Sequence, residues 1–291
     1  MQFSKKVDLA LWITLLCCVS VSLITTITVI AIMGEESIKF FSHVSLSEFF
    51  LGTKWEPLVE PQTFGVLPLV CGSFLVVIGS IFLALPLGLA VAIYLSEFAK
   101  PTLRAFLKPV LEVLAGIPTV VYGYFALTFI TPWLKSFLPE IEVFNALSAI
   151  IVVAIMILPM IVSLCDDGFR ALPRSLREGG YALGATKLEV SLYVVMHSSV
   201  GQISAATILA ISRAIGETMA VVLAAGANPN LTFNPLESIQ TMTAYIVQVS
   251  LGDIPADSIG YQTSYAVGTL LFIITFGMNI IGNWVISKRE F

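Results

Sequence analysis

The sequence predicts an all-α polytopic membrane protein with six transmembrane helices and both termini in the cytoplasm. Three observations support this fold class: a mean hydropathy of +0.94, a charged fraction of 12% against 57% hydrophobic residues, and six long apolar stretches. Soluble domains have about a quarter charged residues, and a bilayer core about 30 Å thick needs about 20 apolar residues per helical span. The predicted spans are Leu9–Met33, Val66–Tyr94, Pro109–Ile130, Ala146–Leu164, Ile203–Ala227 and Ser264–Ile286.

The distribution of basic residues predicts which loops face the cytoplasm. Most of the 15 Lys and Arg residues fall in four segments: residues 5–6, 100–108, 170–187 and 288–289. The other loops are mainly acidic. By the positive-inside rule, both termini and the loop between the fourth and fifth spans are cytoplasmic. The net charge of −4 does not indicate a nucleic-acid partner.

Residues 1–65 are expected to form a transmembrane helix followed by an outer amphipathic loop. The apolar stretch Leu9–Met33 is longer than the apolar core of a signal peptide, and no small-residue cleavage motif follows it. Residues 34–65 contain several aromatic side chains among polar ones, a pattern typical of a segment in the headgroup region. The alternative is a docking surface for an external partner. The four cysteines contain no C-x-x-C pair, so neither a metal site nor a disulfide is indicated.

The second span contains small residues at four-residue spacing, namely Ser80, Ala84 and Gly88. Small side chains so placed let two membrane helices approach closely. We therefore expect a helix-packing seam at these positions.

The third span contains one acidic residue and one helix break. Glu112 lies near the cytoplasmic end, where it pairs with Lys108 or Arg104 in one interpretation and has a functional role in the other. Gly116 and Pro118 interrupt the helix, and such breaks are tolerated only where protein or a water-filled cavity satisfies the backbone. Broken helices are typical of transport pathways.

The fifth span contains two charges. Arg213 and Glu217 are four residues apart, so a continuous helix would place them on one face. A charge in mid-membrane costs about 2.5–3.5 kcal/mol on insertion scales and tends to mark a functional path. One interpretation is a structural ion pair. The other is a guanidinium that binds an oxyanion, with Glu217 holding it and Thr218 adding a hydroxyl.

The longest polar interval between apolar segments lies between the fourth and fifth spans. Ser175 with Glu178, and Thr186 with Glu189, both match the S/T-x-x-E pattern of a capping box. Gly184 lies between them, where a reversing chain favours a residue free to adopt positive φ. We expect a short helix, a glycine turn and a second helix, with an apolar side too small for a core and suited to contact with another protein.

This pattern resembles the cytoplasmic coupling loop of ABC-importer permeases, in which E-A-A, three residues, Gly, nine residues and I-x-L-P recur. The matching positions here are Glu178, Gly179, Gly180 and Gly184, followed by Val194, Met196 and His197. The two glycines in place of alanines, and Met-His in place of Leu-Pro, depart from the family pattern.

A second stretch makes the resemblance more specific. Residues 213–221, R-A-I-G-E-T-M-A-V, are similar to a signature of the PstC-type permeases of phosphate-specific (Pst) ABC importers. Three further stretches agree with this family: Gly52-Thr53 with Trp55 and Pro57, Tyr94–Glu97, and Gly116–Gly123. The resemblance implies a type I ABC-importer permease fold over residues 66–286, with the coupling loop at 166–200 and a cytoplasmic tail at 287–291.

The resemblance also implies a function and a set of partners. The chain would form half of the pathway for inorganic phosphate in the plasma (inner) membrane of a bacterium, surrounded by lipid. A PstA-type permease would supply the other half, two PstB-type ATPases would dock on the coupling loops, and a PstS-type protein would deliver phosphate. The family's intramembrane Arg and Glu map to Arg213 and Glu217. No G-x-x-x-x-G-K-[ST] loop occurs, so the chain is predicted to be non-catalytic, with no cofactor of its own and with ATP and Mg²⁺ bound by the ATPase.

Two alternatives remain from the sequence. A permease for another oxyanion, sulfate or molybdate, would share the coupling loop and the pathway arginine. An ion-coupled secondary transporter would be expected to contain internal repeats, and none is found. A membrane enzyme is not indicated, because no nucleophile and base lie in one motif.

Overall fold

The computed structural model describes residues 5–255 and 258–287, and these residues are mostly helical. The helices are α1 (Lys5–His43), α2 (Leu46–Leu51), α3 (Leu67–Ile93), α4 (Pro101–Ala115), α5 (Thr119–Phe125), α6 (Thr131–Lys135), α7 (Ala146–Ala171), α8 (Arg174–Ala182), α9 (Lys187–Glu189), α10 (Met196–Ser198), α11 (Val200–Ile215), α12 (Met219–Ala225), α13 (Met242–Leu251) and α14 (Ile259–Ser287). Three π-helical segments continue other helices: η1 (Tyr94–Phe98), η2 (Ala126–Ile130) and η3 (Val190–Val195). Strands β1 (Trp55–Glu56) and β2 (Thr63–Phe64) form a small antiparallel pair, with Trp55 opposite Phe64. Of the predicted tail at 287–291, all but residue 287 lies outside the described residues.

The described helices provide up to six membrane crossings. Four are long and apolar enough to span a bilayer singly: Leu9–His43, Leu67–Phe98, Ala146–Ala171 and Ile259–Gly282. Two bent pairs complete the set, Pro101–Ala115 with Thr119–Lys135 at 89°, and Lys187–Ser198 with Val200–Ile215 at 70°. The number therefore reaches the predicted six when each bent pair is taken as one span. The predicted third and fifth spans are not continuous helices.

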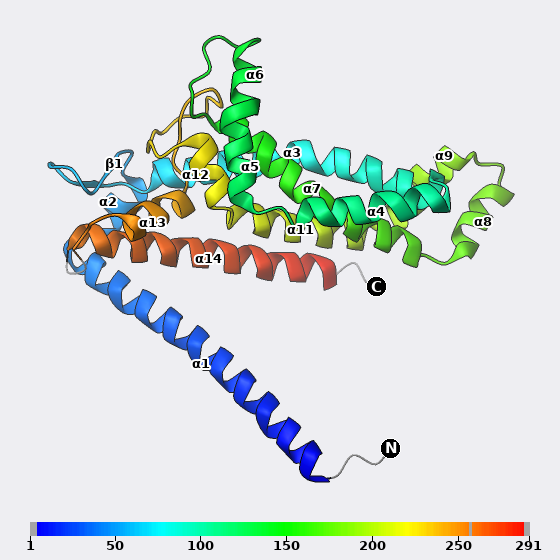
Figure 1. The fold of residues 1–291 in the computed structure, drawn as a ribbon, viewed down its shortest axis with the longest axis horizontal. Coiled ribbons are helices and arrows are strands. Elements are labelled where there is room, and N and C mark those ends of the chain that lie inside the picture. The colour runs from blue at the N-terminus through cyan, green and yellow to red at the C-terminus, as the bar shows by residue number, and fades with distance from the viewer. Residues whose placement is uncertain (1–4, 256–257, 288–291) are drawn as a thin grey trace.

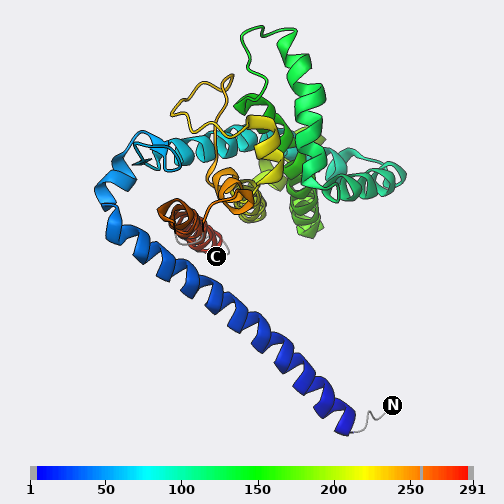
Figure 2. The same ribbon diagram turned by 60° about the vertical axis from the view of Figure 1, so that its left-hand side comes forward.

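The elements are arranged along one long axis (Figure 1). The loop containing α8 and α9 lies at one end, and α2, β1 and α13 lie at the other (Figure 1). Helices α5 and α6 rise away from this axis, and α1 diverges from the remaining helices in both views (Figures 1 and 2). Helix α1 begins, and α14 ends, toward the end that carries α8 (Figure 1).

The centre of the fold is the contact between α3 and α7, which pack along much of their lengths. Ser80 and Ala84 are fully buried, and Ser80 Oγ donates a hydrogen bond to the carbonyl of Ile150 at 3.1 Å. A Cβ on Gly88 would lie 2.7 Å from Ile161 Cγ2. The predicted seam of small residues is confirmed, and α7 is the helix that packs against it.

We expect Ala84→Leu to destabilise the protein by about 1–3 kcal/mol, because extra methylenes in a packed interior force neighbouring side chains from their rotamers. Ala84 is 0% exposed. Ala90→Leu is the matched control, since Ala90 lies on the same helix with an exposed side chain. Thermal unfolding of the purified protein in one detergent would compare the two. Equal melting temperatures would contradict a tight seam.

The segment 34–65 is predicted as an amphipathic loop, but part of it is helical and several of its aromatic side chains are buried. Helix α1 continues to His43, and Phe40, Phe49 and Trp55 are almost wholly buried. The Trp55 ring packs edge-on against Tyr245 of α13, with ring centroids 5.0 Å apart. Phe40, Phe49 and Trp55 are therefore core residues at the end of the fold that holds α2 and β1, because α13 and α14 supply apolar surface that the sequence pattern did not reveal.

Candidate functional site

The loop between α7 and α11 has the predicted helix-turn-helix form, but its first helix begins earlier than expected. Helix α8 starts at Arg174 with Pro173 in the N-cap position, and no side chain caps it. Ser175 and Glu178 therefore lie inside the helix, and their predicted capping box is wrong. The reason is Pro173: its fixed φ favours a helix start immediately after it.

The second half of this loop follows the prediction. Thr186 Oγ1 accepts from the backbone N–H of Glu189 at 3.4 Å, and Glu189 Oε2 accepts from the N–H of Thr186 at 2.7 Å. These reciprocal bonds form the predicted capping box at the start of α9. Gly184 has φ +84°, as expected for the turn. Leu183, beside it, is one of the most exposed apolar side chains described.

We expect Gly184→Ala and Gly179→Ala to have opposite effects on this loop. A Cβ at either position has no atom within 4 Å, so only backbone conformation differs. Left-handed φ costs a non-glycine residue about 1–2 kcal/mol, whereas alanine in a helix is favoured over glycine by roughly 0.5–1 kcal/mol. Amide hydrogen exchange in α8 and α9 should speed up in Gly184→Ala and slow down in Gly179→Ala. A change of the same sign in both variants would contradict this.

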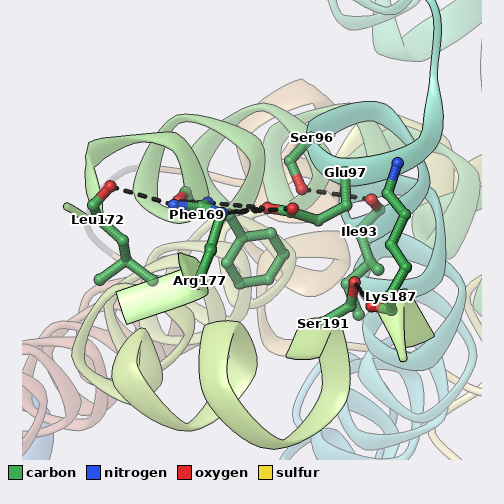
Figure 3. A network of polar contacts seen from close by, with 8 residues as sticks. All are labelled: Ile93, Ser96, Glu97, Phe169, Leu172, Arg177, Lys187 and Ser191. Carbon is green, nitrogen blue, oxygen red and sulfur yellow. Dashed lines mark hydrogen bonds and ion pairs between the residues drawn. The ribbon is translucent and has the colours of Figure 1, made fainter. Parts of the chain in front are cut away.

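A polar network connects α8 to the end of α7 and to η1, and Figure 3 shows its members. Arg177 on α8 contacts Glu97 of η1 through two nitrogens, with Nη2 and Nε at 2.8 and 3.1 Å from Oε1. The same guanidinium donates to the carbonyls of Phe169 at 2.7 Å and Leu172 at 3.1 Å. These carbonyls belong to the end of α7, where helix carbonyls lack intrahelical partners. Arg177 thus joins α8, the end of α7 and the end of the α3–η1 helix.

Two further ion pairs connect α4 to the same end of α7. Arg104 Nη2 lies 2.6 Å from Asp166 Oδ2, and Lys108 Nζ lies 2.9 Å from Asp167 Oδ1. The interpretation in which Glu112 pairs with Arg104 or Lys108 is therefore wrong, since both cations have partners on α7. No local sequence pattern predicts these contacts, because their members are about 60 residues apart.

The break between α4 and α5 occurs where Gly116 and Pro118 interrupt the apolar sequence. Helix α4 ends at Ala115, and α5 starts at Thr119 with Pro118 in the N-cap position. The hydroxyl of Tyr122 donates to the carbonyl of Leu114 at 2.7 Å. A buried tyrosine thus adds a side-chain donor to a carbonyl at the end of α4, which also accepts from the backbone N–H of Ile117 at 3.3 Å.

A second break separates Arg213 from Glu217. Helix α11 ends at Ile215, with Gly216 as its C-cap, and α12 begins at Met219. The two residues therefore do not share one continuous helix face, and among the described residues no ion pair joins them. The predicted arrangement is wrong because Gly216 ends the helix.

Glu217 instead stabilises the break. It is 8% exposed, and its Oε1 accepts from the backbone N–H of Ala220 in the first turn of α12 at 3.1 Å. Its carbonyl accepts from Thr243 Oγ1 at 2.8 Å, and the Thr218 hydroxyl donates to the Gly216 carbonyl at 3.2 Å. A carboxylate at a helix N-terminus is favourable because of the unpaired N–H groups there. Glu217 and Thr218 thus hold the backbone around the break.

Arg213 lines a cavity of about 240 Å³ between α4, α7 and α11. Three other charged residues line the same cavity, namely Lys108, Glu112 and Asp166. Arg213 and Glu112 are both exposed side chains. The cavity therefore contains cationic and anionic groups together, beside the two helix breaks. Within the described part of the chain, no group of three or more His, Cys, Asp or Glu residues could hold a metal ion.

Comparisons with known proteins agree on the type of protein. Residues 84–289 match the family model of the binding-protein-dependent transport system inner membrane component. A probable ABC transporter permease, YqgH of Bacillus subtilis (strain 168), is 33% identical over 94% of this chain and 89% of its own. The phosphate transport system permease PstC of Mesorhizobium japonicum is 31% identical over 91% and 87%, and that of Haemophilus influenzae is 31% identical over 92% and 89%.

A solved structure has the same fold. The MetNI methionine ABC transporter, in an inward-facing conformation, contains a chain that aligns with a TM-score of 0.58. The alignment covers 80% of this chain and 99% of that chain at 15% identity, which shows a shared type I importer fold alone. Together with the family model and the relatives, these findings establish a non-catalytic, multi-pass permease subunit of an ABC importer: the chain belongs to the binding-protein-dependent transport system inner membrane components.

Proposed function

We propose that this chain is the PstC-type permease subunit of an ATP-driven importer of inorganic phosphate. The observation that carries the proposal is Arg213, a cation that lines a cavity between two helix breaks. A guanidinium offers a fork of donors that matches phosphate oxygens. Support for phosphate comes from the similarity to PstC permeases over about nine-tenths of the chain.

The partners we propose follow from the same family. A PstA-type permease completes the pathway, two PstB-type ATPases bind ATP and Mg²⁺, and a PstS-type protein delivers phosphate from outside. One ATPase contacts the α8–η3 loop, which places this loop and both termini in the cytoplasm. In Figure 1, α1 starts and α14 ends toward the side that carries α8, and this supports the proposed orientation.

The proposed mechanism is alternating access. ATP-driven closure of the ATPases moves the α8–η3 loop, and Arg177 transmits this movement to the ends of α7 and η1 through its hydrogen bonds. Because α3 packs along α7, both move as one unit and open the pathway outward. Hydrolysis resets it inward, and Arg213 provides charge compensation weak enough for the anion to leave.

A second oxyanion remains as a candidate substrate, because the same arginine would suit sulfate or molybdate. Radiolabelled phosphate uptake into proteoliposomes that contain this chain, its partner subunits and ATP on the ATPase side tests both. Uptake that needs ATP and the binding protein, and that resists competition by sulfate and molybdate, would support the phosphate importer. ATP-dependent uptake of a competitor in place of phosphate would change the substrate. Uptake driven by an ion gradient without ATP would reject the proposed coupling.

A further inference from the structure

The cavity beside Arg213 contains hydrogen-bond acceptors as well as cations. Lys108 and Arg213 are the cations, and Glu112 and Asp166 are the carboxylates. A site for a fully deprotonated anion needs only donors, and an acidic group beside it is unfavourable because of like-charge repulsion. Two carboxylates in its lining therefore require an explanation.

One of these carboxylates has a spare acceptor atom. The side chain of Asp166 is 3% exposed, and its ion pair with Arg104 uses Oδ2 only. Its Oδ1 is buried and has no hydrogen-bond partner among the described residues. Buried polar atoms are almost always paired, so an unpaired carboxylate oxygen that belongs to a cavity-lining residue points to a ligand with a proton to donate.

The other carboxylate, Glu112, has no partner among the described residues. No hydrogen bond or ion pair of Glu112 occurs among the described residues, since Lys108 pairs with Asp167 and Arg104 with Asp166. Glu112 comes from α4 and Asp166 from α7, whereas Arg213 comes from α11. Three helices thus bring a cation and two acceptors to one cavity. Its 240 Å³ exceeds by far the roughly 10–15 Å³ that a single water needs, so an ion of five non-hydrogen atoms fits.

We propose that this cavity recognises the hydroxyl proton of its oxyanion: Arg213 binds the charged oxygens, while Glu112 and Asp166 Oδ1 accept hydrogen bonds from P–OH groups. The inference rests on the proposed function and gives it a basis for selectivity. Near neutral pH, inorganic phosphate keeps one or two protons, whereas sulfate keeps none. Sulfate in this cavity would place its oxygens against carboxylate oxygens with no hydrogen between them. A site built to bond a hydroxyl strongly rejects an analogue that lacks it.

Monofluorophosphate is the sharpest probe of this proposal. It has fluorine in place of one hydroxyl, and near neutral pH it is a tetrahedral dianion without a P–OH group. Its charge and size are close to those of hydrogenphosphate, which has one P–OH group, so these two dianions differ mainly in one donated proton that either carboxylate can accept. Both anions contain phosphorus and can be followed by ³¹P NMR line broadening, which detects weak binding.

The experiment uses the complex of this chain with its partner permease and ATPases in lipid nanodiscs, without the binding protein. Wild-type complex should bind phosphate at least about tenfold more tightly than monofluorophosphate, since a hydrogen bond to a charged acceptor contributes about a factor of ten or more. Glu112→Gln should reduce that preference to about threefold or less by weakening phosphate binding, because an amide is a weaker acceptor than a carboxylate. Glu140→Gln is the control, as Glu140 is an exposed carboxylate that does not line the cavity.

Each outcome bears on the proposal. A retained tenfold preference in Glu112→Gln, or equal binding of the two anions by the wild-type complex, would overturn it. ATP-driven phosphate uptake by the same preparation distinguishes this failure from a failure of the proposed function. If the wild-type complex takes up phosphate but binds the two anions equally, the proposed importer stands and the proposed recognition of the proton is rejected. Loss of both uptake and phosphate binding in the wild type would overturn both.

Discussion

Arg177→Ala should destabilise the assembled permease by about 3–5 kcal/mol, the range expected when one partner of a buried ion pair is removed. The side chains of Arg177 and Glu97 are 17% and 7% exposed. Without the guanidinium, Glu97 becomes an unpaired carboxylate, and the carbonyls of Phe169 and Leu172 lose their donors. A thermal shift of the purified complex measures the stability. Phosphate uptake should fall as well, because the connection from the loop to α7 and η1 is lost.

The matched control is Arg174→Ala. Arg174 lies three residues earlier on the same helix, its side chain is exposed, and it forms no ion pair among the described residues. Arg177→Lys tests the geometry, since lysine keeps the charge but cannot reproduce the planar fork, and it should retain part of the stability. If Arg177→Ala and Arg174→Ala had the same melting temperature, the network would not connect these three elements.

Arg213→Ala should reduce phosphate uptake by on the order of 100-fold, whereas the complex should still assemble. Two charge-assisted hydrogen bonds from one guanidinium contribute about 1.5–3 kcal/mol each, and about 1.4 kcal/mol corresponds to a factor of ten. Assembly should persist because Arg213 is exposed to the cavity and no ion pair of its own holds the fold among the described residues. Initial uptake rates and co-purification of the partner subunits would be measured together.

Arg213→Lys separates the effect of the positive charge on uptake from the effect of the guanidinium geometry. Lysine keeps one positive charge without the bidentate fork, so its uptake should lie between those of the wild type and Arg213→Ala. Normal uptake by Arg213→Ala would remove this residue from the pathway and make its role structural. Loss of the partner subunits on purification would contradict the expectation that the fold is independent of Arg213.

Local patterns in the sequence predicted the features that depend on few neighbours. The apolar runs predicted the spans, the spacing of Ser80, Ala84 and Gly88 predicted the seam, and Gly184 predicted a left-handed turn. The structure agrees with the seam and the turn, and with the six spans when each bent helix pair is taken as one span. These features follow from hydropathy, side-chain size and backbone freedom, which are properties of the residues themselves.

Features that depend on tertiary partners were missed or placed wrongly. A four-residue spacing suggested a shared face for Arg213 and Glu217, but Gly216 ends α11 between them. Helix α13 lies between the predicted fifth and sixth spans, in a segment predicted as an outer loop. The surface that buries Trp55 was therefore not predicted either. The pair Glu97 and Arg177 is separated by 80 residues, and no local pattern indicates that two such residues meet.

The length of α1 has a consequence for how this protein meets its membrane. Its apolar stretch Leu9–Met33 extends about 37 Å at roughly 1.5 Å per residue, whereas the hydrocarbon layer is about 30 Å thick. A tilt of about 37° removes this hydrophobic mismatch and lies within the range seen for membrane helices. Near its C-terminal end α1 contacts α14, where the Ser37 and Thr269 hydroxyls are 2.7 Å apart, and it diverges toward its start (Figure 2). A thicker bilayer would therefore swing α1 about this contact, so that the angle between the two helices depends on the lipid as well as on the sequence.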